Sequence, residues 1–141
     1  MKILILCTGN SCRSQMAHGW ISELSDKVEV YSAGTKPAEK VNSFAVQAMQ
    51  KFNIDISSNT TNDVKEYREM NFDLVLTVCD KAKETCPVVL NTLESIHESF
   101  PDPVEYEGTE QEKLDYYLEV CTSMKDWIHE ILTQKNLVKD Y

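Results

Sequence analysis

The sequence lacks the features that place a chain in a membrane or on nucleic acid. None of its apolar runs approaches the roughly 20 residues that span a bilayer, and the N-terminus has no apolar segment that ends in a small-residue cleavage site. Basic residues are scarce: 14 Lys and Arg stand against 23 Asp and Glu, and the net charge of −9 works against nucleic-acid backbones and anionic membranes. We therefore expect a cytoplasmic protein that binds neither nucleic acid nor membrane.

Repeats, low-complexity tracts and linkers are also missing. A chain of 141 residues suits a single domain over residues 1–141 and is long enough to bury a proper core. The sequence also lacks the compact set of four Cys and His ligands that indicates a structural metal site. Its five cysteines, an odd number in a chain with no secretory segment, are more typical of redox or catalytic thiols than of a disulfide framework.

Apolar residues alternate between strand-like runs and helical spacing along the chain. Strands are expected at 2–6, 28–32, 74–78 and 95–99, and helical spacing runs from the first loop to about residue 25, then over 41–52 and 114–132. Asn62 is expected to cap a short helix that carries Val64 and Tyr67. Strands separated by helices predict an α/β fold of three layers, α/β/α, with a four-stranded parallel sheet.

A short polar loop follows the first apolar run and precedes the first helix. It comprises Cys7-Thr8-Gly9-Asn10-Ser11-Cys12-Arg13-Ser14, and we call these eight residues the anion loop. A strand that stops at such a loop before a helix aims several backbone N–H groups, and the positive end of a helix dipole, at one spot. We expect an oxyanion to bind there.

Two side chains of the anion loop suggest chemistry as well as binding. Arg13 offers a planar fork that matches two oxyanion oxygens, and the same positive field should lower the pKa of Cys7 and make it a thiolate. Gly9 and Asn10 tolerate the positive φ values that a tight concave loop demands. Ser14 is expected to donate its hydroxyl to the Cys7 sulfur. The alternative is a buried cysteine at a strand end with an unrelated arginine nearby.

The candidate residues converge on one edge of the predicted sheet, because parallel sheets bind ligands outside the carboxyl ends of their strands. Cys7 ends the first strand, Cys79 ends the third, and the segment 100–103 follows the fourth. Asp102 lies between two prolines, which hold its loop out of helix or sheet. A carboxyl fixed over an anion site is easily protonated and could be the general acid for a leaving oxygen. The alternative is an ordinary aspartate of a surface turn.

The other cysteines admit several interpretations. Cys79 and Cys86 are separated by six residues, so a disulfide between them requires the segment to loop back until the two Cα atoms lie within roughly 7 Å. Lysines between them favour thiolates, and free structural cysteines are the alternative. Cys12 could be a bystander or could protect Cys7 by pairing with it. Cys121 lies on the apolar face of the last helix and is most simply a buried small hydrophobe.

These motifs resemble a known family. The anion loop resembles the phosphate-binding loop of low-molecular-weight protein tyrosine phosphatases, and Asp102-Pro103 resembles their general-acid loop. The chain is still more similar to the thioredoxin-coupled arsenate reductases of that fold. The motifs that carry this similarity are Ser14-Gln15-Met16-Ala17, Tyr31-Ser32-Ala33-Gly34, Asp55-Ile56-Ser57 and the pair Cys79 and Cys86. The resemblance extends over nearly the whole chain.

The resemblance implies a reduction of arsenate to arsenite. Arg13 and the backbone N–H groups would hold arsenate, Cys7 would attack arsenic, and Asp102 would protonate the departing hydroxyl. Cys79 would then attack Cys7 and release arsenite, and Cys86 would attack Cys79 to form a disulfide that thioredoxin reduces. A mobile loop or partly unwound helix is expected at 80–88. We expect a monomer with no tightly bound cofactor.

The chain departs from some of these relatives at a cation site. Those relatives bind a potassium ion beside the loop through one acidic residue in the first helix and another after the second. The matching positions here are His18 and Asn62, neither of which carries a negative charge, so a potassium ion is doubtful. Asn10, Ser32 and Thr60 keep polar groups at the other positions and are expected to hold the loop by hydrogen bonds.

Two rival functions remain. A phosphatase acting on phosphotyrosine or a small phosphoester would use Cys7, Arg13 and Asp102 alone, and the anion loop does not discriminate, because phosphate and arsenate are near-isosteric. Cys79 and Cys86 favour arsenate reduction, since phosphoester hydrolysis has no use for them. A non-catalytic anion-binding module would leave the three thiols unexplained.

Overall fold

Four parallel strands form the central sheet. The computed structural model describes residues 1–79 and 91–139, and the strands are β1 Lys2–Cys7, β2 Glu29–Gly34, β4 Leu74–Thr77 and β6 Ser95–His97, in the spatial order β2-β1-β4-β6. Residues 3–6 of β1 are fully buried, because this strand lies between β2 and β4 and is covered by helices. The predicted α/β class and four-stranded parallel sheet are confirmed.

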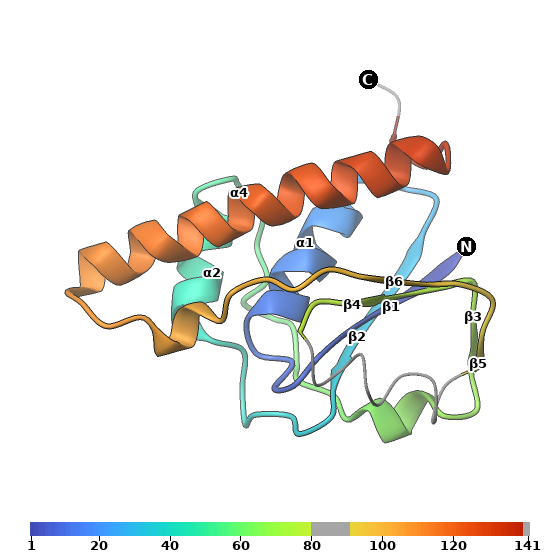
Figure 1. Cartoon of the computed structure of the whole chain (residues 1–141), viewed down its shortest axis with the longest axis horizontal. Coiled ribbons are helices and arrows are strands. Elements are labelled where there is room, and N and C mark those ends of the chain that lie inside the picture. The colour runs from blue at the N-terminus through green and yellow to red at the C-terminus, as the bar shows by residue number, and fades with distance from the viewer. Residues whose placement is uncertain (80–90, 140–141) are drawn as a thin grey trace.

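The α-helices in the described residues are α1 Arg13–Leu24, α2 Ser43–Gln50 and α4 Glu110–Gln134. They pack against one another, and α1 packs against β1 and β2 of the sheet. Figure 1 shows all three on one side of the sheet, with α4 lying across α1 and α2, and the short 3₁₀ helix η1 (Val64–Tyr67) on the other side. The buried face of α4 consists of Tyr117, Val120, Cys121, Met124, Ile128, Ile131 and Leu132. This is the apolar stripe that the sequence predicts, and Cys121 is a buried hydrophobe as expected.

Capping side chains mark where the helices α2 and α4 begin. The side chain of Asn42 accepts hydrogen bonds from two backbone N–H groups at the start of α2, and Thr109 forms a capping box with Glu112 at the start of α4. The prediction that Asn62 caps the short helix is wrong, because Asp63 is the N-cap of η1 and accepts from the N–H of Lys65. The backbone N–H of Asn62 donates instead to the side-chain oxygen of Asn10.

Among the described residues, two short strands and a 3₁₀ helix have no counterpart in the sequence prediction. The strands β3 Asn71–Phe72 and β5 Asn91–Thr92 pair as a separate two-stranded parallel sheet, and a 3₁₀ helix η2 spans Pro103–Glu105. Elements of two or three residues are too short to show a period of hydrophobicity, which is why the sequence pattern does not mark them. None of the helices in residues 1–79 and 91–139 is long and apolar enough to cross a bilayer.

Candidate functional site

The anion loop connects the end of β1 to the start of α1 at the carboxyl edge of the sheet. Cys7 is the last residue of β1, and Arg13 is the first residue of α1. Cys12 is the N-cap of α1 but gives the helix no side-chain hydrogen bond, which leaves the first-turn N–H groups of α1 to other partners. The loop therefore has the position predicted for it.

The carbonyl groups of the loop are held from outside by the segment that follows β2. Four of them accept hydrogen bonds from backbone N–H groups: Cys7 from Thr35 (3.3 Å), Thr8 from Lys36 (2.8 Å), Gly9 from Ala38 (2.8 Å) and Ser11 from Asn42 (2.7 Å). In a planar trans peptide the C=O and the following N–H point in opposite directions. Carbonyls drawn toward the segment 35–42 therefore turn the next N–H groups away from it, which is the arrangement of an anion-binding nest.

The backbone of the loop includes one residue of positive φ. Asn10 has a φ of 50°, as expected for a tight concave loop. Gly9, which also tolerates a positive φ, does not adopt one. The left-handed residue of the loop is Asn10, whose short polar side chain can stabilise that conformation by local hydrogen bonds.

The Cys7 sulfur is enclosed by polar groups of the loop. Cys7 is only 2% exposed, and its sulfur accepts a hydrogen bond from the backbone N–H of Asn10 at 3.2 Å. The thiol donates to the Ser14 hydroxyl at 3.0 Å, and the same hydroxyl oxygen accepts from the Asn10 side-chain amide at 2.8 Å. The predicted hydrogen bond between Ser14 and Cys7 is thus present. While the sulfur keeps its proton, Cys7 is the donor and Ser14 the acceptor, which is the reverse of the prediction.

Burial dominates the ionisation of Cys7. It raises the pKa of the thiol, the hydrogen bonds with Ser14 and Asn10 lower that pKa by less, and the neighbouring Cys79 raises it further. The predicted lowering of the pKa is therefore wrong for this arrangement. The physical reason is that burial removes the thiolate from solvent, which outweighs the hydrogen bonds that would stabilise it.

Arg13 connects the anion loop to the segment that follows β6. One guanidinium nitrogen donates to the carbonyl oxygen of Phe100 at 3.1 Å, and another lies 3.5 Å from a carboxylate oxygen of Asp102. The Phe100 N–H donates in turn to the Val78 carbonyl at 3.3 Å, just beyond the end of β4. The segments after β1, β4 and β6 therefore meet at one edge, as the sequence predicts.

Asp102 caps a turn and also lies beside Arg13 of the anion loop. One carboxylate oxygen accepts from the N–H of Val104 at 3.1 Å and caps η2, which is the ordinary use of an aspartate in a turn. The other oxygen faces Arg13. The side chain is 32% exposed, so the carboxyl is fixed beside the anion loop and still reachable by solvent. Its role as a general acid stays a prediction.

A second thiol lies against the anion loop. Cys79 is 5% exposed, and its sulfur is 3.3 Å from the hydroxyl oxygen of Thr8. Cys7, Cys12, Cys79 and Cys121 are all free thiols. Cys86 and the segment 80–88, where a mobile loop is expected, lie outside the described residues.

The positions matched to the potassium site of some relatives hold a hydrogen-bond network. His18 Nδ1 is 3.0 Å from the Ser32 hydroxyl, and burial lowers the pKa of His18, which keeps the ring neutral at neutral pH. The backbone N–H of Asn62 donates to the side-chain oxygen of Asn10 at 2.8 Å. Within residues 1–79 and 91–139, no group of three or more His, Cys, Asp or Glu side chains is placed to hold a metal ion. The doubt that potassium binds at these positions stays a prediction.

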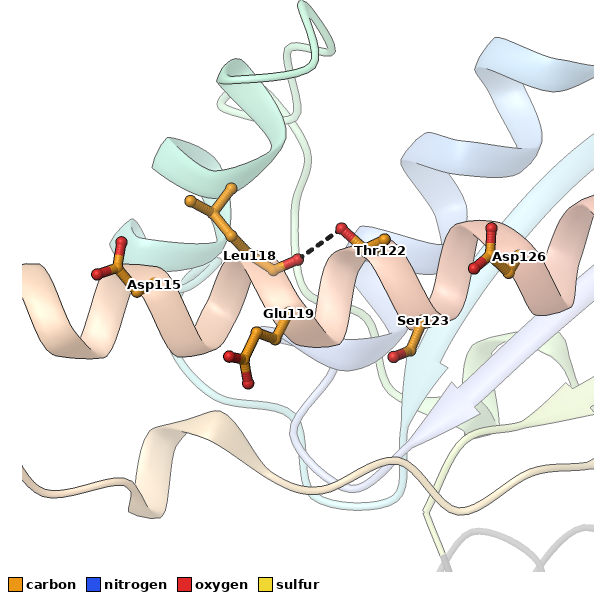
Figure 2. A pocket seen from close by; sticks show the side chains of 6 residues that line it. All are labelled: Asp115, Leu118, Glu119, Thr122, Ser123 and Asp126. Carbon is orange, nitrogen blue, oxygen red and sulfur yellow. Dashed lines mark hydrogen bonds between the residues drawn. The ribbon is translucent and has the colours of Figure 1, made fainter.

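A hollow on the exposed side of α4 lies apart from these residues. Figure 2 shows that it is lined by Asp115, Leu118, Glu119, Thr122, Ser123 and Asp126. Its three acidic side chains disfavour an anion, and none of the predicted site residues contributes to it. The anion loop is therefore the candidate site.

Comparison with known proteins agrees with this fold and site. Residues 2–140 match the family model of the low molecular weight phosphotyrosine protein phosphatases, and the chain belongs to this family. Among curated relatives, an arsenate reductase of Halalkalibacterium halodurans is 46% identical over 112 residues, 79% of this chain and 80% of that protein. An arsenate reductase of Bacillus subtilis is 44% identical over 119 residues, 84% of this chain and 85% of that protein.

Solved structures share the same architecture. An arsenate reductase in its oxidized state is similar with a TM-score of 0.81 at 22% identity, covering 94% of this chain and 97% of that one. A low molecular weight protein tyrosine phosphatase from T. tengcongensis is similar with a TM-score of 0.76 at 24% identity, covering 95% and 99%. Because the fold is common to both kinds of enzyme, it does not discriminate between arsenate reduction and phosphoester hydrolysis.

Proposed function

We propose that this protein reduces arsenate to arsenite through Cys7, and that a Cys7-Cys79-Cys86 disulfide relay is regenerated by thioredoxin. The observation that carries the proposal is the position of Cys79, a buried free thiol whose sulfur lies 3.3 Å from Thr8 of the anion loop. Relatives more than 40% identical over most of the chain are named arsenate reductases, which supports the same substrate.

The first step is an attack of the Cys7 thiolate on arsenate. Backbone N–H groups and Arg13 hold the arsenate oxygens. Cys7 forms a sulfur–arsenic bond, and a hydroxyl leaves as water after Asp102 gives it a proton. Burial raises the pKa of Cys7 and so disfavours its thiolate. The positive charge of Arg13 stabilises the attacking thiolate and the oxyanion most when its guanidinium turns from Asp102 to the bound oxyanion.

The second step moves the oxidation onto protein sulfur. The Cys79 thiolate attacks the Cys7 sulfur, the sulfur–arsenic bond breaks, and its electron pair stays on arsenic, which leaves as arsenite. Two thiols have then lost two electrons, and arsenic has gained them. Cys86 attacks Cys79 and frees Cys7, and the dithiol of thioredoxin reduces the Cys79–Cys86 bond.

Phosphoester hydrolysis is the second candidate, because Cys7, Arg13 and Asp102 lie together without any need for the other thiols. The test is arsenate-dependent oxidation of NADPH with thioredoxin and thioredoxin reductase. The variants are C7S, C79S and C86S, with C121A as the control cysteine. We expect C7S, C79S and C86S to lose multiple turnover and C121A to keep it.

Hydrolysis of p-nitrophenyl phosphate by the same proteins provides the contrast, since Cys7 is the one thiol that it requires. If C79S and C86S reduce arsenate at the wild-type rate while C7S does not, the relay is wrong. If the wild type hydrolyses the phosphoester through Cys7 and does not reduce arsenate, hydrolysis is the better assignment.

A further inference from the structure

Gln15 is a buried polar side chain directly behind the anion loop. It is fully buried in α1, and its amide nitrogen donates to two carbonyl oxygens, those of Asn10 and Thr60, each at 3.0 Å. Its amide oxygen accepts from the side chain of Asn59 at 3.1 Å. Both N–H donors of the amide are therefore used, and the bond from Asn59 fixes which end of the amide faces the two carbonyls.

Gln15 adds outer support to the loop at Asn10, whose carbonyl lies between those of Gly9 and Ser11 and is not held by the segment 35–42. The carbonyls of Cys7, Thr8, Gly9 and Ser11 accept from backbone N–H groups of that segment. The carbonyl of Asn10 accepts from the Gln15 side chain. Since the C=O and N–H of a trans peptide are antiparallel, Gln15 also fixes the direction of the Ser11 N–H, which points away from Gln15.

Asn10, whose carbonyl accepts from Gln15, has a backbone conformation that requires support. Asn10 adopts a φ of 50°, a left-handed conformation that a residue other than glycine keeps only where its surroundings hold it. Its own N–H donates to the Cys7 sulfur, and its side chain bonds both Ser14 and the backbone of Asn62. The carbonyl that Gln15 holds belongs to the Asn10–Ser11 peptide, and the N–H on the sulfur belongs to the Gly9–Asn10 peptide. A displacement of Asn10 itself, which joins these two peptides, would therefore disturb the sulfur and the Ser11 N–H together.

We propose that Gln15 is a positioning residue that holds the Asn10–Ser11 peptide in its anion-binding orientation and keeps the Asn10 N–H on the Cys7 sulfur. The proposal rests on the oxyanion site proposed above and adds a residue that touches neither oxyanion nor sulfur. The segment 59–62 contributes the other half of this support, through Asn59, Thr60 and Asn62.

The test is Gln15→Met, which keeps the length of the side chain and removes both donors. Gln47→Met, the same change on an exposed position of α2, is the matched control. The pH dependence of Cys7 alkylation by iodoacetamide and the protection of Cys7 by inorganic phosphate are measured for each protein. The titratable neighbours Cys12, Arg13, Cys79 and Asp102 are the same in every variant.

For Gln15→Met we expect the alkylation midpoint to move to higher pH, since the Asn10 N–H that lowers the Cys7 pKa is loosened. We also expect weaker phosphate protection and a fall in kcat/KM for arsenate on the order of 10²-fold, the loss that follows a misplacement of about 1 Å. Gln47→Met should match the wild type. If Gln15→Met only lowers the melting temperature, with wild-type midpoint and protection, the proposal is wrong.

If Gln15→Met does not fold, Asn59→Ala replaces it, because it removes only the bond that orients the amide. The same changes at smaller size support the proposal, and a wild-type midpoint and protection overturn it. Alkylation and phosphate protection require neither arsenate turnover nor the relay. A wild-type protein that fails to reduce arsenate would therefore refute the proposed function and leave the test of Gln15 intact.

Discussion

The close approach of β2 to the anion loop makes Gly34→Ala the most direct test of how the loop is shaped. Gly34 pairs with Cys7 across the parallel ladder, and its N–H donates to the Asn62 carbonyl at 2.9 Å. A Cβ at this position would lie 2.5 Å from the Thr8 carbonyl oxygen and 2.9 Å from the Asn10 nitrogen. Both atoms belong to the loop backbone, so neither can rotate away as a side chain would.

The size of the effect follows from these distances. Ordinary contact begins at 3.4 Å, so β2 and the loop must separate by about 0.9 Å. Overpacking of this kind costs about 1 to 3 kcal/mol, and the loss of chain entropy in the unfolded Ala variant offsets about 0.4 to 1 kcal/mol. We therefore expect a net loss of about 1 to 2 kcal/mol, which lowers Tm by about 3 to 8 °C for a chain of this size. The displaced N–H groups should lower kcat/KM on the order of 10²-fold.

Thermal unfolding of the wild type, Gly34→Ala and Gly9→Ala, with and without inorganic phosphate, measures both effects. Gly9 is the stability control, because its φ is not positive and a Cβ there would only touch the Ser11 hydroxyl at 3.4 Å. Gly9→Ala should melt at the wild-type temperature. A Gly34→Ala protein that melts as the wild type does, and that phosphate stabilises equally, would refute the view that β2 shapes the loop.

Three further predictions concern the acid, the support of Arg13 and the buried thiols. Asp102→Asn should lower kcat for arsenate by about 10² to 10⁴ while alkylation of Cys7 persists, and an unchanged kcat would remove Asp102 from the mechanism. Trp127→Leu removes a ring contact at 5.3 Å from Phe100, whose carbonyl holds Arg13. A loss of about 0.5 to 1.5 kcal/mol should raise the Kd for phosphate by up to about tenfold, as calorimetry can check. Burial raises the pKa of Cys121 to about 12, so the native state keeps a proton that the unfolded chain loses, and stability should fall as pH rises from about 9 toward 12. Cys121→Val should flatten that slope in urea titrations, and parallel profiles would contradict the assignment.

The sequence alone could predict the site where local pattern and topology act together. An apolar run, a polar loop and a helical stripe define the anion loop, and the rule that parallel strands share a carboxyl edge brings Cys79 and Asp102 to it. The structure places Cys79 beside Thr8 and Asp102 beside Arg13. These predictions depend on the parallel direction of the strands, which the alternation of strand-like runs with helical spacing indicates.

The sequence could not predict features that depend on the direction of a single group in space. The raised pKa of Cys7 follows from burial, which outweighs the hydrogen bonds with Ser14 and Asn10. The pairing of Arg13 with Phe100 and Asp102 is a second example, since no spacing in the sequence shows where a guanidinium turns. The support from Gln15 was missed for the same reason. The one available signal was a polar residue next to the buried Met16 and Ala17 in a helix, since a fully buried amide must find partners.

The groups that shape the anion loop and the thiol that follows β4 come from separate parts of this fold. This separation explains why the same loop suits both arsenate reduction and phosphoester hydrolysis. The segment 35–42 and Gln15 bond carbonyls of the loop and thereby direct the next N–H groups to any tetrahedral oxyanion. The segment 59–62 holds Gln15 and the Asn10 side chain in place. What distinguishes the chemistries comes from a different strand. β4 pairs in parallel with β1, with Thr77 opposite Leu6, so a residue two positions beyond Thr77 must emerge beside the loop. In the relay that we propose, the cysteine at that position, whose sulfur lies 3.3 Å from the Thr8 hydroxyl, is the second thiol, and only a reaction that oxidises sulfur makes use of it.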